Sequence, residues 1–199
     1  MVKTSSVFAL ASALIIGVDS QFINLPDVPQ GVFNVSTRIE IQGTAAAAWD
    51  AITDFANYPT WNPFVRKAVV VSPLHITLPE QRPVEGAHLY FRVQIPPLPL
   101  PVDENTPDNP LNTQFSYENI THVQPELGRV AWKYYAPEVA LEAERWSAVT
   151  DIAGGKVVYE SREVYSGLLA STLRASLAES LQQSFDAQGE GLKLLLEES

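Results

Sequence analysis

The sequence predicts an α+β domain, in which a curved antiparallel seven-stranded sheet wraps around a long C-terminal helix. Segments in which apolar and polar residues alternate recur along the chain, as expected for strands with one buried face. The C-terminal segment instead carries a leucine at every fourth position, which is typical of an amphipathic helix. Such a stripe needs an apolar partner, and a sheet that curves around it provides one.

The first strand is predicted at Phe33–Ile41, where one face is apolar and the other is polar. Two short helices are expected before the second strand. Thr44 is suited to cap the first of them, because its hydroxyl can accept a hydrogen bond from a free backbone N–H group. Pro59 ends this region, and bulky side chains are expected to close one end of a cavity: Tyr58, Trp61 and Phe64.

Six further strands and the long helix complete the order. The strands are predicted at Val65–Val71, Ala87–Ile95, Thr113–Val123, Arg129–Tyr135, Leu141–Thr150 and Lys156–Tyr165. The helix is predicted from Gly167 to about Glu198, with a break or bend at Gly189 and Gly191, where each glycine costs about 1 kcal/mol. The proline-rich stretch 96–112 is either a stiff surface loop or a lid over the cavity, with Leu98 and Leu100 facing a ligand.

Composition excludes several classes of protein. The chain has 199 residues, a net charge of −10 and no cysteine. Such an acidic chain offers no basic surface for nucleic acid, and the lack of cysteine excludes disulfides and thiolate sites. Three histidines without paired spacing predict no metal site, and no motif implies a cofactor. The sequence does not specify an oligomeric state.

The N-terminal residues 1–20 are typical of a secretory signal peptide. A lysine at position 3 precedes the apolar run Val7–Val18, and small residues before Gln21 suit cleavage. A retained membrane anchor or a buried helix is the alternative. We expect a mature domain at 21–199 that is secreted or lumenal and not stably inserted in a membrane. Glycan acceptor sequences at Asn34 and Asn119 agree with this route.

Three segments carry a resemblance to a known family. They are the aromatic turn Tyr58–Pro63, the segment Tyr117–Trp132, and the strand-to-helix junction Glu163–Leu169. Together they resemble the START-like (SRPBCC) superfamily, which includes polyketide cyclases/dehydrases and the birch-pollen allergen group. The resemblance implies a helix-grip fold built around a hollow. It also implies binding of lipids, sterols, quinones or polyketides, with catalysis in only some members and no shared catalytic motif.

Alternation in the last two strands predicts which residues face the interior. The apolar faces include Arg145 and Glu163, which a short turn at Gly154-Gly155 would place opposite each other. Because an unpaired buried charge is unfavourable, we expect them to pair and Glu163 to stay ionised. The pair is either structural or a polar anchor, in which Glu163 acts as a base and Arg145 stabilises an enolate or oxyanion.

The same parity predicts a mainly aromatic cavity wall, with ordinary core packing as the alternative. The residues are Phe91, Phe115, Tyr117, Val130, Trp132, Tyr134, Tyr159 and Tyr165. Asn119 shares the parity of Tyr117, so a glycan there would point inward. Either that acceptor is unused, or a bulge shifts the register and turns His122 inward as a proton-transfer candidate; otherwise His122 is a surface residue.

Two functions remain open. The first is binding of an apolar small molecule, polyketide-, terpenoid- or lipid-like, in an internal cavity. The second is a cyclase, dehydratase or isomerase that acts on such a molecule. The lack of a nucleophile–base motif or a phosphate loop favours the first. A purely structural domain would have no cavity.

Overall fold

The computed structural model describes residues 22–198. The predicted signal peptide at 1–20 lies outside the described residues. Within residues 22–198, no helix combines the length and apolar character needed to cross a membrane.

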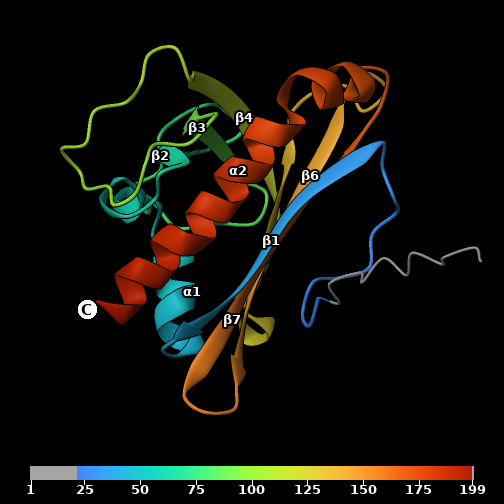
Figure 1. The fold of residues 1–199 in the computed structure, drawn as a ribbon. Coiled ribbons are helices and arrows are strands. Elements are labelled where there is room, and N and C mark those ends of the chain that lie inside the picture. The colour runs from blue at the N-terminus through green and yellow to red at the C-terminus, as the bar shows by residue number, and fades with distance from the viewer. Residues whose placement is uncertain (1–21, 199) are drawn as a thin grey trace, which may run out of the picture.

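A single seven-stranded antiparallel sheet forms the body of the molecule (Figure 1). Its strands in chain order are β1 (Phe33–Gln42), β2 (Val65–Val71), β3 (His88–Gln94), β4 (Thr113–Gln124), β5 (Arg129–Tyr134), β6 (Glu142–Ile152) and β7 (Lys156–Ser166). The spatial order is β1-β7-β6-β5-β4-β3-β2, so the first two strands form opposite edges. The predicted α+β fold and its seven strands are confirmed.

The connection between the two edge strands contains the helices α1 (Ala45–Thr53) and η1 (Phe55–Thr60). Thr44 caps α1 as predicted, because its Oγ1 accepts a hydrogen bond of 3.2 Å from the backbone nitrogen of Ala47. Tyr58 is buried, and its hydroxyl donates to the carbonyl oxygen of Ile52 at 2.6 Å. A third short helix, η2 (Pro125–Leu127), joins β4 to β5.

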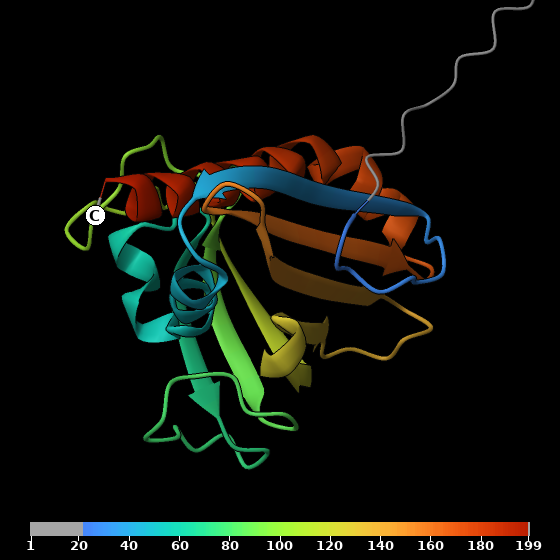
Figure 2. The same cartoon turned by 90° about the horizontal axis from the view of Figure 1, so that it is seen from below.

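The long helix α2 (Ala170–Glu197) crosses the inner face of the sheet (Figures 1 and 2). It is continuous, so the break predicted at Gly189 and Gly191 is wrong. A Cβ atom at Gly189 would lie 3.2 Å from Thr37 Oγ1, and one at Gly191 would lie 2.5 Å from the carbonyl oxygen of Trp61. The glycines therefore permit close approach to β1 and to the aromatic turn, and this packing outweighs their low helix propensity.

The proline-rich stretch 96–112 is anchored to the body of the protein. Arg66 of β2, which is only 3% exposed, donates to the carbonyl oxygens of Asp103 (2.8 Å) and Thr106 (3.1 Å). Leu98 is buried, and its backbone nitrogen donates to Pro63. Leu100 lies beside the position of Gly191, at the C-terminal end of α2. These contacts favour the surface-loop interpretation over a lid, as no residue of 96–112 lines the cavity described below.

The first described residues cover part of the outer face of the sheet. Glu160 of β7 is fully buried, and its carboxylate accepts hydrogen bonds from the backbone nitrogens of Ile23 (2.7 Å) and Asn24 (2.9 Å). A guanidinium nitrogen of Arg162 donates to the carbonyl oxygen of Pro26 at 2.6 Å. This segment therefore shields β6 and β7 on the side away from α2.

Candidate functional site

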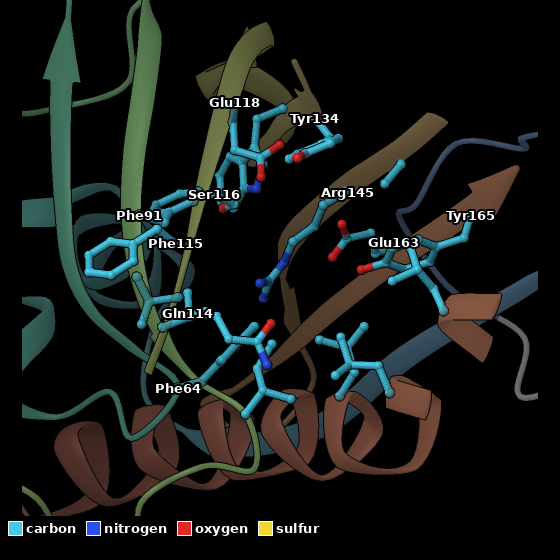
Figure 3. Close-up of a pocket in the computed structure, with 18 of the residues that line it drawn as sticks. Phe64, Phe91, Gln114, Phe115, Ser116, Glu118, Tyr134, Arg145, Glu163 and Tyr165 are labelled. Carbon is cyan, nitrogen blue, oxygen red and sulfur yellow. The ribbon is translucent and has the colours of Figure 1, made fainter. Parts of the chain in front are cut away.

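A cavity of about 200 Å³ lies between the inner face of the sheet and the N-terminal half of α2 (Figure 3). Its walls are mainly apolar. The sheet contributes aromatic and β-branched side chains, which include Val65, Phe91, Val93 and Trp132, and α2 contributes Leu173, Leu177 and Leu181. Phe64, which follows the aromatic turn, lines the cavity as expected, whereas Tyr58 and Trp61 are buried in the core and do not line it. Such walls suit an apolar ligand.

Arg145 of β6 is the central polar group of this cavity and is only 3% exposed. Its Nε donates to Ser161 Oγ at 3.0 Å, and a terminal nitrogen donates to Gln188 Oε1 at 3.0 Å. Its guanidinium carbon lies 4.1 Å from the ring centroid of Phe185, a cation–π contact. These contacts fix the side chain in place without a carboxylate.

Glu163 lies directly opposite Arg145 in the β6–β7 register, as predicted. The expected direct ion pair is nevertheless not among those that residues 22–198 form. Ser161 and Gln188 hold the guanidinium instead. The sequence reasoning missed this because it considered only the two strands and not the polar residue that α2 presents to them.

The Glu163 carboxyl lies near Arg145 and Tyr165 (Figure 3). Burial raises its pKa, while the positive charge of Arg145 and a hydrogen bond with Tyr165 act in the opposite direction. Burial outweighs them, so the pKa of Glu163 is raised and the group is easier to protonate than an ordinary glutamate. The sequence, by contrast, favoured an ionised carboxylate.

Glu118 of β4 is a second cavity carboxyl, which the sequence analysis missed. It is 6% exposed and lies on the other side of Arg145 from Glu163 (Figure 3). Burial is the main cause that raises the pKa of Glu118 well above the usual range, and the negative charge of Glu163 adds to it. A protonated carboxyl donates one hydrogen bond and the guanidinium several, so this cluster can recognise an acceptor oxygen on a ligand.

The predicted aromatic wall is partly observed. The cavity is lined by Phe91, Phe115, Trp132, Tyr134 and Tyr165. Tyr159 instead lies in the core, where its hydroxyl accepts a hydrogen bond from Gln188 Nε2 at 3.2 Å. Val130 is likewise buried in the core and does not line the cavity.

The prediction of which β4 residues face the cavity is wrong. This is why Glu118 was missed and Tyr117 was wrongly assigned to the cavity wall. Glu118 and Ile120 face inward and are buried, whereas Tyr117 contacts side chains of the outer face. Asn119 shares the outward parity of Tyr117, so a glycan there would not enter the cavity. Hydrophobicity misled the prediction because the polar side chains Gln114, Ser116 and Glu118 of this strand line the cavity, whereas Tyr117 faces outward. Phe115, of the same parity as Tyr117, also borders the cavity but is 76% exposed.

A bulge is present in β4, but it does not turn His122 inward. The β4–β5 register shifts between Ile120 and His122. The imidazole of His122 packs against the ring of Trp146, with 4.7 Å between ring centroids, on the outer face. The proton-transfer role considered for His122 therefore has no support in the cavity, and the surface interpretation fits better.

Comparison with known proteins identifies the family of this fold. Residues 32–197 match the family model described as polyketide cyclase / dehydrase and lipid transport. No curated protein sequence matches the chain.

Solved structures share the architecture at low sequence identity. A hypothetical protein, jhp0584, from Helicobacter pylori is 13% identical with a TM-score of 0.65, and the match covers 88% of this chain and 98% of that one. A START superfamily protein from Mycobacterium smegmatis is 12% identical (TM-score 0.57; coverage 83% and 97%). The ginseng major latex-like protein 151 from Panax ginseng is 10% identical (TM-score 0.57; coverage 82% and 97%). These likenesses describe the fold alone.

Proposed function

We propose that this chain, which belongs to the family of polyketide cyclases, dehydrases and lipid-transport proteins, binds an apolar small molecule in the cavity under α2. A polyketide-, terpenoid- or lipid-like molecule with one carbonyl, phenol or carboxylate group fits the chemistry of the walls. The single observation that carries this proposal is the polar cluster of Arg145, Glu118 and Glu163 inside an otherwise apolar cavity.

The arrangement of the cluster supports binding. Arg145 is held by neutral partners, so its positive charge is not neutralised by a contacting carboxylate. A ligand oxygen with partial or full negative charge would compensate that charge in a site of low dielectric. The two carboxyls with raised pKa values can donate to the same oxygen when they are protonated.

A cavity-filling variant tests the proposal. Leu177→Trp should occupy the space and weaken binding of an anilinonaphthalene sulfonate dye, an apolar anion, at least about tenfold, a loss of about 1.4 kcal/mol. Ala175→Trp, on the exposed side of the same helix, is the matched control and should bind like the wild type. Equal dye affinity in all three proteins would exclude this cavity as the binding site, and mass spectrometry of co-purified small molecules would identify a natural occupant.

A second candidate is acid–base catalysis of the cyclase, dehydratase or isomerase type. It is favoured by the raised pKa of Glu163 next to Arg145, since burial makes this carboxylate a stronger base than an ordinary glutamate and the neighbouring cation can stabilise an enolate. Exchange of the α-protons of β-tetralone, an apolar ketone, in heavy water would reveal such chemistry by NMR. Glu163→Gln should bind the ketone but lose the exchange; exchange at the wild-type rate would reject Glu163 as the base.

We also propose export into the secretory pathway, which the apolar N-terminal run and the two glycan acceptors support. Asn34 is exposed on β1, and Asn119 lies on the outward parity of β4. Expression in a secreting eukaryotic host should give a mature N-terminus at Gln21. A mobility shift with endoglycosidase that Asn34→Gln and Asn119→Gln remove would identify the sites, and an intracellular, unprocessed product would contradict the proposal.

A further inference from the structure

The outer face of β3 and β4 carries a group of side chains that the cavity does not use. We call it the outer cluster, and it consists of His75, His88, Tyr90, Tyr117 and Tyr135. Tyr90 and Tyr117 are directly opposite in the β3–β4 register, and their rings stack with centroids 4.6 Å apart. Tyr90 is 41% exposed and Tyr135 60% exposed, so solutes in water can reach the cluster.

Four nitrogen and oxygen atoms of this cluster converge. His75 Nδ1 lies 2.7 Å from the hydroxyl of Tyr90 and 3.2 Å from that of Tyr117. The Tyr117 hydroxyl also contacts His88 Nδ1, so it lies between the two imidazoles. Their ring centroids are 6.2 Å apart. Two imidazole nitrogens and two phenolic oxygens therefore share one small volume.

His75 lies in a tight turn of the connection between β2 and β3, which extends beyond the sheet (Figure 2). The backbone nitrogen of His75 donates to the carbonyl oxygen of Ser72, and the Ser72 hydroxyl accepts from Ile76. His75 has φ of 61°, a left-handed conformation that is unusual for a residue other than glycine. This turn aims the ring at the two tyrosines.

We propose that His75, His88, Tyr90 and Tyr117 form a binding site for one Cu²⁺ ion. Ligand bonds of about 2.0 Å to a central metal separate neighbouring ligand atoms by about 2.8 Å at a right angle and about 3.3 Å at a tetrahedral angle. The separations of 2.7 and 3.2 Å between His75 Nδ1 and the two phenolic oxygens lie close to that range, whereas His88 Nδ1 and the Tyr117 hydroxyl lie closer and would move apart on binding. The site therefore needs only small side-chain movements to accept an ion.

The choice of copper follows from the ligand atoms. Imidazole nitrogens with phenolic oxygens suit Cu²⁺, which also binds most tightly among the divalent first-row metals. On binding, each coordinating phenol releases its proton to solvent, so two phenolates would balance the charge of the ion without a redox step. No three side chains of His, Cys, Asp or Glu in residues 22–198 gather into a metal-binding group, so the proposed site depends on its two tyrosines as well as on its two histidines.

Titration of the chelator-treated full chain with Cu²⁺ tests the proposal. We expect one ion per chain, a phenolate-to-copper absorption band in the visible range, and nitrogen hyperfine splitting in the electron paramagnetic resonance spectrum. His75→Ala and His88→Ala should each weaken binding by at least about tenfold, since loss of even an outer-shell partner costs 10- to 100-fold. Circular dichroism verifies that both variants remain folded.

His122→Ala is the matched control, because His122 is the third histidine of the chain and lies away from the cluster against Trp146. It should bind copper like the wild type. The double variant Tyr90→Phe/Tyr117→Phe keeps both rings and should lose the visible band. Wild-type affinity in His88→Ala, a loss as large in His122→Ala, or a band that survives in the double variant would each overturn the proposal.

Discussion

Strand β4 presents two different chemistries on its two faces. Inward, Glu118 is removed from water, and burial raises its pKa well above the usual range. Outward, Tyr117 belongs to an accessible cluster in which polar atoms contact one another and solvent can enter. Burial is also the main cause that raises the pKa of Tyr117. The two faces therefore differ in degree: Glu118 is 6% exposed and its pKa is raised well above the usual range, whereas Tyr90, which stacks on Tyr117, is 41% exposed.

The largest effect is expected for the inner arginine. Arg145→Met should destabilise the protein by about 3 kcal/mol, because Ser161 Oγ and Gln188 Oε1 each lose a buried charged donor. Arg92→Met, which removes a 2.7 Å contact with Asp108 from a side chain that is 38% exposed, should cost at most about 1 kcal/mol. Urea unfolding measures both, and similar losses would remove the distinction between a buried and an exposed arginine.

A smaller effect is expected for Glu160, which is buried on the covered part of the outer face. Glu160→Gln should cost about 2 kcal/mol, because the carboxylate accepts two backbone N–H groups and lies 3.4 Å from Arg38 Nε. Thermal unfolding near neutral pH measures it, and hydrogen exchange should speed up first at residues 22–30. Unchanged stability would show that the hydrogen bonds of Glu160 do not hold residues 22–30 against the sheet.

Replacement of Glu118 should have the opposite effect on stability from replacement of Glu160, and the size of the effect should depend on pH. Its folded-state pKa is raised above the unfolded value, so its contribution favours folding at low pH and is lost as pH rises from about 4.3 through the folded-state pKa. Glu118→Gln should therefore become more stable relative to the wild type as pH rises, by at most about 1.4 kcal/mol per pH unit. Urea midpoints between pH 4 and 8 measure the gap, and a constant gap would contradict the raised pKa.

The smallest effect is expected on the open part of the outer face. Tyr135→Ala should change stability by no more than about 0.5 kcal/mol, because the side chain is 60% exposed. The inner counterpart is Tyr134→Ala, because Tyr134 is the preceding residue and lines the cavity; thermal unfolding of both variants measures the difference. A loss for Tyr135→Ala as large as for its neighbour would mean that the outer cluster contributes to folding.

The sequence predicted the fold and half of the site, for physical reasons that particular residues illustrate. The alternation of apolar and polar residues placed Arg145 and Glu163 opposite each other, because the two-residue repeat of a strand and the short turn between β6 and β7 together determine their register. It failed at Glu118, whose strand hides polar residues in the cavity. It also failed for Gln188, because contacts between α2 and a distant strand leave no local pattern. His75 and Tyr117 are 42 positions apart, and only the folded sheet brings them together.

Two glycines of α2, Gly189 and Gly191, affect the size of the cavity. They set the C-terminal half of the helix at a fixed height above β1 and the aromatic turn, with no room for even a methyl group at Gly191. The start of the helix is held as well, because the backbone nitrogen of Leu169 donates to the carbonyl oxygen of Ala140 at 2.9 Å and Ala170 is fully buried. Between these two ends, Leu173 and Leu177 are only partly buried and line the cavity. The helix is therefore held at both ends, and the volume of the cavity beneath its middle follows from the positions of these two contacts.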